Sequence, residues 1–351
     1  MRLDSDHPDI TPLPTEQVIP LRQHYRFARA MGAVLLAIGV MCVGAAYCVS
    51  IYSLFNTKVF TNGTGTSGLM LTSFLVGLPL VAGILVTWLA GRSRKAGLAK
   101  SGMLTMLALA LFVFAAGALL REGMICILMA APLFVVLGLI GVVIGMVTAS
   151  MKPARRNKLM SMVAVMPLAM GAAESTRIAP VETQHMEQSV YIDAPPATVW
   201  HHVNYPTNIQ PSELKDGIAY KMGVPYPIKA RTIEPKVGGL RELTWQRNVT
   251  FQEEITDWED NRYIAWKYKF TAQSFPDGSL DDHIVIGGRY FNLLNTGYRL
   301  APEGRGTRLT LLVTNTVSTN FNWYAGAWSR FLINDTGHAL LQFYKHRSEA
   351  T

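Results

Sequence analysis

The sequence is short of cysteine and of charged side chains. Of its 351 residues, 3 are cysteine and 16% are charged, whereas 50% are hydrophobic. Cys42, Cys48 and Cys126 all lie in apolar stretches, which excludes a disulfide framework and the paired spacing of a zinc site. So little charge beside so much apolar surface is unusual for a soluble protein and indicates a membrane protein.

The C-terminal half also lacks a charge excess. Residues 1–182 hold 15 Lys and Arg against 7 Asp and Glu, whereas residues 183–351 hold 17 of each, so the first half carries the whole net charge of +8. A nucleic-acid surface would need its basic excess on the folded domain. We therefore expect no nucleic-acid partner and assign the excess to short loops beside anionic lipid.

Long apolar runs without ionisable side chains occupy the first half. Four of them, at residues 30–51, 68–90, 103–120 and 124–149, are long enough to cross a bilayer as helices. None contains Asp, Glu, Lys, Arg or His. Proton relays and ion-coupled transporters need such groups within the membrane, so this absence argues against both activities.

The segment ahead of the first run, residues 1–28, is polar and contains four prolines. This composition is typical of a flexible tail. A polar start of this length does not resemble a cleavable signal peptide.

Basic residues lie at alternate ends of the apolar runs. Three Arg precede the first run, and groups of four Lys or Arg lie within residues 92–100 and 152–158. By the positive-inside rule, the N-terminus and both of these loops are cytoplasmic. We expect residues 29–173 to form the transmembrane region of a multi-pass protein of the bacterial inner (plasma) membrane, with the lipid bilayer as its partner.

A fifth apolar stretch, residues 159–173, leaves two arrangements open. Fifteen residues at about 1.5 Å each cover roughly 22 Å, less than the roughly 30 Å of the hydrocarbon core. If the stretch spans, the C-terminal domain is extracytoplasmic; if it lies flat on the membrane, the domain is cytoplasmic. The basic cluster before it and Glu174 after it favour the span.

The C-terminal domain, residues 183–351, follows a linker at 174–185. It opens with alternating apolar and polar residues at 188–193, typical of a strand, and with Pro195 and Pro196 at the start of a helix. A short helix or turn is expected at 204–213. Further strand patterns lie at 228–234, 240–246, 248–258, 263–271, 284–294, 297–301 and 307–318, and a helical pattern closes the chain at 322–347.

This order resembles the START-like helix-grip (SRPBCC) superfamily, which includes polyketide cyclase/dehydrase and lipid-transport proteins. The resemblance is carried by residues 190–200, Val-Tyr-Ile-Asp-Ala-Pro-Pro-Ala-Thr-Val-Trp, and supported by 255–258, 297–300, 306–310 and the closing helix. It implies an α+β domain in which a curved antiparallel sheet wraps around the long helix and leaves a cavity. It implies no particular chemistry, because the superfamily contains binders, transfer proteins and enzymes. Joined to membrane spans, such a domain also looks like a group of uncharacterised bacterial membrane proteins.

Aromatic and charged side chains on the expected strands and final helix are candidates for the cavity lining. The candidates are Trp245, Arg247, Phe251, Glu253, Trp266, His283, Tyr290 and Trp328. Glu253 is the one candidate for a general acid or base, because it shares a strand face with Phe251 and Ile255. The alternative is that Glu253 or Arg247 forms an internal ion pair or meets solvent. Strand register decides the lining, because a slip of one residue moves every side chain to the other face.

The sequence offers no convincing cofactor or metal site. His201 and His202 are adjacent and so cannot share a helix face as ligands. Residues 281–283, Asp-Asp-His, are more typical of a solvated loop than of a cation site. Gly287 and Gly288 fall within a strand pattern, where they indicate a bulge or bend and not a phosphate loop. We expect neither cofactor nor metal.

Three functions remain open at this point. The leading one is membrane-tethered binding of a hydrophobic small molecule or lipid in the cavity of the START-like domain. The second is a cyclase- or dehydratase-like enzyme acting on an apolar substrate. The third is a structural or partner-docking role, although the sequence identifies no protein partner. Binding is favoured over catalysis.

Overall fold

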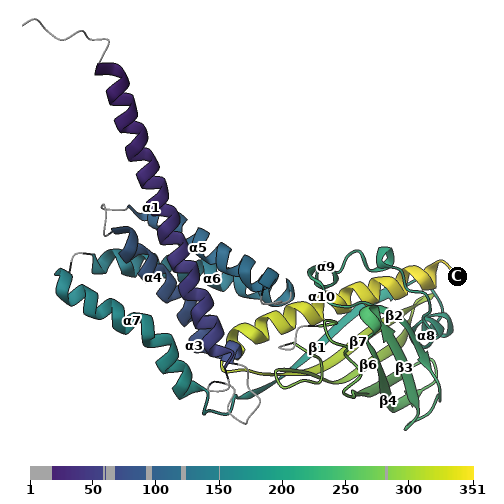
Figure 1. The fold of residues 1–351 in the computed structure, drawn as a ribbon. Helices are drawn as coiled ribbons and strands as arrows, with labels where there is room; N and C mark the ends of the chain where they lie inside the picture. The colour runs from purple at the N-terminus through teal and green to yellow at the C-terminus, as the bar shows by residue number, and fades with distance from the viewer. Residues whose placement is uncertain are drawn as a thin grey trace, which may run out of the picture.

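The computed structural model describes residues 18–57, 60, 68–91, 97–119, 124–149, 151–280 and 284–351. The chain forms a bundle of membrane helices, followed by a seven-stranded sheet that curls around the C-terminal helix (Figure 1). This arrangement is the expected helix-grip fold at the end of a helical transmembrane region.

The bundle contains the apolar helices that the sequence predicts. Its elements are α1 (Val18–Phe55), η2 (Gly68–Met70), α3 (Thr72–Leu75), α4 (Gly77–Gly91), α5 (Leu98–Leu119), α6 (Met124–Thr148) and α7 (Pro153–Glu174). Four segments in the described part of the chain are long and apolar enough to cross a membrane: Ala30–Phe55, Thr72–Gly91, Leu98–Ala118 and Met124–Thr148. The four predicted spans are therefore confirmed as apolar helices.

Two boundaries in the bundle differ from the prediction. The tail predicted at 1–28 is helical from Val18 onward, because its last proline, Pro20, lies in the first turn of α1, where the missing N–H has no helical partner. The second span does not begin as one regular helix but as η2 and α3, ahead of α4. Residues 1–17 lie outside the described residues.

Glycines bring α4 and α6 into backbone contact. A Cβ on Gly83 would lie 2.2 Å from the carbonyl oxygen of Gly138, and a Cβ on Gly141 would lie 2.1 Å from that of Leu80. Neither distance is possible for a real side chain. Small residues at such crossings let membrane helices pack closely in the absence of a hydrophobic driving force.

Helix α7 packs against the apolar helices α1, α3 and α4. The hydroxyl of Tyr47 in α1 donates to the carbonyl of Ala164, 3.0 Å away. The ring of Pro167 lies against Gly77 of α4. At the end of α7, the carboxylate of Glu174 accepts hydrogen bonds from the backbone N–H groups of Thr72 and Ser73, at 2.7 and 2.8 Å. Glu174 thereby caps the N-terminus of α3, whose N–H groups have no partner within their own helix.

The sheet is fully antiparallel, in the order β1-β7-β6-β5-β4-β3-β2. Its strands are β1 (Val181–Ile192), β2 (Pro227–Thr232), β3 (Leu240–Trp245), β4 (Thr250–Glu259), β5 (Tyr263–Lys269), β6 (Phe291–Glu303) and β7 (Gly306–Ser318). Short helices α8 (Pro196–Asn204), η3 (Pro211–Leu214), α9 (Ile218–Met222) and η4 (Gln246–Asn248) connect them. The predicted strand-then-helix opening at 188–200 is confirmed by β1 and α8.

Two strand predictions were wrong in detail. Strand β1 begins at Val181, inside the predicted linker at 174–185, because it pairs with the whole of β7 from Ser318 to Thr307. Of the strand predicted at 284–294, residues 284–290 are not part of a strand. Residues 291–294 and the strand predicted at 297–301 form one strand, β6, which pairs continuously with β7 apart from a bulge between Leu293 and Asn295. The chain before β6 turns at Gly287, whose φ of 79° favours glycine, so the predicted bend there is confirmed.

The C-terminal helix α10 (Asn322–Glu349) lies against the concave side of the sheet and runs from the bundle to the far end of the domain (Figure 1). Its buried residues Ile333, Leu341, Phe343 and Tyr344 belong to the main hydrophobic core, together with side chains from α8 and from β1, β4, β5, β6 and β7. The sequence does not predict α9, which packs beside α10 through the bond from the Ala219 N–H to Asp335.

Candidate functional site

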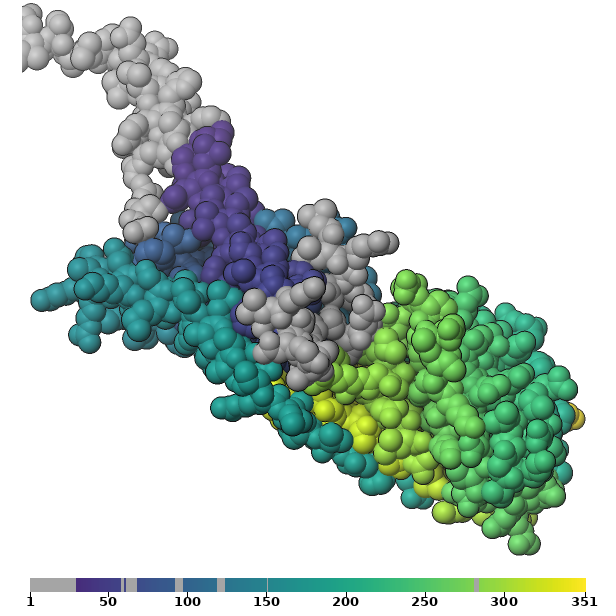
Figure 2. Space-filling model, turned by 60° about the horizontal axis from the view of Figure 1, so that its bottom comes forward, coloured from purple at the N-terminus to yellow at the C-terminus, as the bar shows by residue number. Residues whose placement is uncertain are grey.

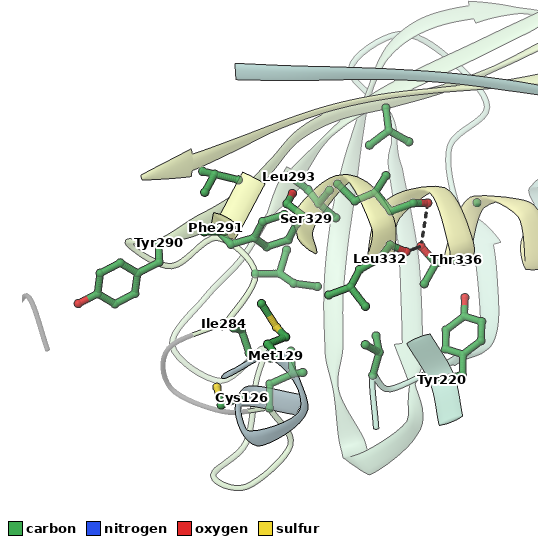
Figure 3. A pocket seen from close by; sticks show the side chains of 18 of the residues that line it. Cys126, Met129, Tyr220, Ile284, Tyr290, Phe291, Leu293, Ser329, Leu332 and Thr336 are labelled. Atoms are coloured by element: carbon green, nitrogen blue, oxygen red, sulfur yellow. Dashed lines mark hydrogen bonds between the residues drawn. The ribbon is translucent and has the colours of Figure 1, made fainter. Parts of the chain in front are cut away.

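A cavity of about 350 Å³ lies between the sheet, α10 and the ends of the membrane helices nearest the domain. Figure 3 shows Met129 and Cys126 on one side of it and Leu332, Thr336 and Tyr220 on the other. One water molecule needs roughly 10–15 Å³ of such space, so the cavity is large enough for an organic molecule.

The domain supplies one part of the cavity wall. The strands contribute mainly aromatic and aliphatic side chains, whereas α10 adds Ser329, Leu332, Thr336 and Leu340 at helical spacing. These strand residues are Leu243, Trp245, Trp266, Tyr268, Phe291, Leu293, Tyr298, Leu311 and Val313. A mostly apolar wall with few polar groups is the usual form of a small-molecule site.

The membrane helices supply the other part of the wall. Their lining residues are Tyr52 of α1, Leu69 and Met70 of η2, Phe74 and Leu75 of α3, Phe112, Val113 and Ala116 of α5, and Cys126, Ile127, Met129, Ala130 and Phe134 of α6. Sequence reasoning did not anticipate this contribution, because contacts between distant segments leave no local periodicity.

One buried ion pair is part of the cavity wall. Arg241 on β3 stands directly opposite Glu253 on β4, with Nη1 at 3.0 Å from Oε2, in an ion pair whose atoms are not aligned as a hydrogen bond. Both side chains are 2% exposed. The guanidinium also lies 4.0 Å from the ring centre of Trp266 and donates from Nη2 to the Val203 carbonyl at 3.1 Å. The alternative reading of Glu253 as one half of an internal ion pair is therefore confirmed.

Burial changes the titration of Glu253. Removal from water is the largest influence on its carboxyl and raises the pKa to about 7, while the charge of Arg241 and the indole N–H of Trp266 act in the opposite direction. Near neutral pH the carboxyl is therefore present in both forms. It can offer the cavity an O–H donor or an acceptor oxygen.

Some buried donors on the cavity wall have no hydrogen-bond partner among the residues that the structure describes. They include Nε of Arg241 and, at the other end of β3, Nε1 of Trp245. A buried donor left unpaired costs about 1–3 kcal/mol, so such groups mark places where a polar atom of a ligand would be stabilised.

The structure brings together half of the residues that the sequence proposed as lining. Trp245, Glu253, Trp266 and Tyr290 line the cavity. Trp245, Glu253 and Trp266 lie on β3, β4 and β5, and Tyr290 lies directly before β6.

The other proposed residues lie elsewhere. Phe251 is buried behind the wall, in an aromatic cluster with Trp245 and Phe270. Arg247 lies in the exposed turn after β3, at φ 60°, and donates to the Ser279 carbonyl. Trp328 contacts Tyr324 and Phe331 on α10, while its neighbour Ser329 lines the cavity instead. His283 lies outside the described residues.

Sequence reasoning missed Arg241, the charged partner at the centre of the site. On β3, Arg241 lies two residues before Leu243 and four before Trp245, so all three share one face of the strand. Leu243 and Trp245 also line the cavity. This period of two was the available signal, but an isolated Arg in a strand pattern is normally assigned to the solvent face. Among the described residues, no three His, Cys, Asp or Glu side chains gather in a way that could hold a metal ion.

No family model and no curated protein matches the chain. Solved structures match its C-terminal half. The Zhui aromatase/cyclase from a Streptomyces species aligns at 16% identity and a TM-score of 0.29, over 48% of this chain and 94% of that one. Protein TTHA0849 from Thermus thermophilus aligns at 18% identity and 0.30, over 48% and 98%. Protein SA2116 of unknown function from Staphylococcus aureus aligns at 11% and 0.32, over 48% and 96%. Identities and scores at this level support no statement about function.

Proposed function

We propose that this protein is a membrane-tethered binding protein for a hydrophobic small molecule or lipid, held in the cavity of a START-like domain. The observation that carries the proposal is a cavity of about 350 Å³ whose wall is apolar except for hydroxyl groups and one buried ion pair. A structural or docking module would need no such space. An interior filled by side chains would have favoured a structural or docking role.

A cyclase- or dehydratase-like reaction is the second candidate, and it rests on Glu253. A carboxyl with a pKa near 7 inside a cavity suits a general acid or base. Against it, Arg241 and Glu253 are the only Asp, Glu, Lys, Arg or His side chains among the described lining residues, and each faces the other. Binding is therefore favoured, with the pair as the polar anchor.

We also propose that the domain lies outside the cytoplasm. The bundle residues that face the domain lie at the C-terminal ends of α1 and α5 and the N-terminal ends of α3 and α6. These ends are opposite to the basic segments 92–100 and 152–158, which the positive-inside rule assigns to the cytoplasm. Helix α7 starts at the basic side, and its 22 residues at about 1.5 Å each reach roughly 33 Å, of which the apolar residues 159–173 cover roughly 22 Å.

Two experiments test these proposals. A reporter enzyme fused after Thr351 and active only outside the cytoplasm should be active, and a reporter active only inside should not be; the reverse result would overturn the placement. For binding, the full chain purified in detergent should release a hydrophobic compound on solvent extraction and mass spectrometry.

A matched pair of variants on α10 makes the binding test specific. Leu332→Trp fills the cavity, since Leu332 faces into it (Figure 3), and should abolish co-purification. Phe331→Trp changes the adjacent residue, which is 39% exposed and does not line the cavity, and should retain the compound. Equal amounts in both variants, or none in the unmodified protein, would overturn the binding function.

A further inference from the structure

The cavity continues beyond the domain into the bundle of membrane helices. Aromatic rings of four helices surround its far part. Tyr52 of α1 lies 6.2 Å from both Phe74 of α3 and Phe112 of α5, measured between ring centres. Phe112 in turn stacks on Phe134 of α6 at 6.3 Å. All four rings line the same cavity as Arg241 and Glu253.

The two parts of the cavity are joined by packed side chains. Ile125, in the first turn of α6, forms a hydrophobic cluster with Leu280 and Ile286 of the domain. One turn further along, the carbonyl of Met129 accepts a hydrogen bond from Tyr324 of α10. The first turns of α6 therefore contact both the bundle and the domain. The cavity that these turns line extends into both parts of the protein.

The polar side chains of the cavity lie in its domain part, and its bundle part is mainly apolar. The charged pair lies on β3 and β4, and Thr296, Ser329 and Thr336 of the domain add hydroxyl groups. The far part is lined by rings and by small side chains, with Ala116 on α5 and Ala130 on α6. The predicted spans at 30–51, 68–90, 103–120 and 124–149 contain no charged residue and no histidine. A ligand that matches this gradient has one polar end and a long apolar part.

We propose that the ligand is a lipid with a long acyl or prenyl chain, and that this chain occupies the bundle part of the cavity while the polar end lies in the domain. This inference rests on the proposed binding function and narrows it to a chain-bearing class. A compact polycyclic molecule would fit in the domain alone and would leave the apolar bundle part without a role. Each buried methylene contributes about 0.8 kcal/mol, so the bundle part would make affinity depend on chain length.

Tryptophan substitutions in the bundle part test this placement. Ala116→Trp and Ala130→Trp add an indole to the far part of the cavity on two different helices. Phe114→Trp and Leu128→Trp are their controls, because Phe114 and Leu128 lie on the same helices at 71% and 39% exposure and do not line the cavity. The probes are oleoyl lysophosphatidylglycerol and its hexanoyl counterpart, added to the full chain in detergent.

The unmodified protein should bind the oleoyl lipid more tightly than the hexanoyl lipid. Both cavity variants should weaken oleoyl binding by about tenfold or more, the loss expected from displacing about two methylenes, and leave hexanoyl binding unchanged. Both controls should behave as the unmodified protein does. If the cavity variants retain the full preference for oleoyl, the chain does not enter the bundle, while the binding function stands. If the unmodified protein binds neither lipid, both proposals fail.

A measurement on the unmodified sequence guards against variants that do not fold. A lysophosphatidylglycerol with a diazirine at the chain end, crosslinked by light, should label the inward-facing Phe112, Ala116 and Phe134. An excess of unlabelled oleoyl lipid should remove this labelling but not that of the outward-facing Phe114. Labelling confined to outward-facing residues or to the sheet would overturn the inference.

Discussion

Tyr324 of the C-terminal helix donates a hydrogen bond from its hydroxyl to the backbone carbonyl of Met129 in membrane helix α6. The two residues belong to parts of the protein that the sequence presents as separate domains. Pro132, one turn after Met129, interrupts the regular hydrogen bonding of α6 near this contact. The bond therefore joins the domain to α6 about one turn from a residue that cannot donate a helical hydrogen bond.

Tyr324→Phe should loosen this contact without disturbing either core. Losing one hydrogen bond costs about 0.5–1.5 kcal/mol, and the Phe ring can keep its contacts with Trp323 and Trp328. Amide hydrogen exchange should become faster in the first turns of α6 and α10. Tyr205→Phe, at an exposed position on the far side of the domain, should leave exchange there unchanged. Unaltered exchange in Tyr324→Phe would mean that packing alone holds the junction.

Glu253 should make the protein less stable as the pH rises through the range from about 4.5 to about 7. Burial raises the pKa of Glu253 from 4.5 to about 7 in the folded protein, so the folded state holds a proton that the unfolded state has lost. The stabilisation is complete below pH 4.5 and is lost by about pH 7. A difference of this size corresponds to about 3 kcal/mol.

Thermal unfolding of the detergent-solubilised protein at a series of pH values measures this slope. Glu253→Gln cannot titrate and should flatten the profile across that window. Glu242→Gln, an exposed acid on the same strand as Arg241, should retain the slope of the unmodified protein. If the stability of Glu253→Gln still falls as the pH rises through this window, other titrating groups cause the pH dependence.

Glu174→Gln should weaken the junction between α7 and α3. The two carboxylate oxygens accept one hydrogen bond each, from the backbone N–H groups of Thr72 and Ser73, whereas a Gln amide has one acceptor oxygen and no charge. Loss of the charged cap of α3 should cost about 0.5–2 kcal/mol, as for other helix caps. The melting temperature should fall, and more so at neutral pH than in acid, where both forms are uncharged. The exposed Glu187→Gln serves as the control.

Gly141→Ala should destabilise the bundle. The added methyl group would lie 2.1 Å from the Leu80 carbonyl oxygen, which forces α4 and α6 apart at a cost of about 1–3 kcal/mol. Gly39→Ala, where the methyl group would meet nothing within 4 Å, should be neutral or slightly stabilising. Thermal unfolding of both variants gives the comparison. Equal melting temperatures would show that the bundle relaxes around the new methyl group.

Local patterns were sufficient for most of the fold. The apolar runs predict the four spans because a bilayer leaves few alternatives to a long apolar helix. Alternation at Val190 and Ile192, followed by Pro195 and Pro196, predicts β1 and α8 for equally local reasons. The alternation pattern wrongly predicted two strands separated near Asn295, where β6 has a bulge. A bulge with polar residues has the sequence pattern of a turn when the pairing strand is unknown.

The site was harder to predict, because it depends on contacts between distant segments. Glu253 and Trp266 were found because their strand positions fix the face on which they lie. Arg241 was missed, since its role depends on Glu253 standing directly across the hairpin, which one strand alone does not show. The bundle wall around Phe112 could not be predicted at all. Each membrane helix is apolar on every side, so its sequence does not distinguish a lipid-facing side from a cavity-facing side.

The connection between α7 and β1 limits how far the domain can travel. Only residues 175–180 separate Glu174 from Val181, and even fully extended they reach at most about 20 Å. Pro180 is further held by Asn322 of α10, and Figure 2 shows α7 and β1 as one continuous band along the edge of the molecule. Under the proposed function, a connection this short would keep the domain beside one membrane. A protein that supplies or accepts the bound molecule would then have to come to that membrane surface.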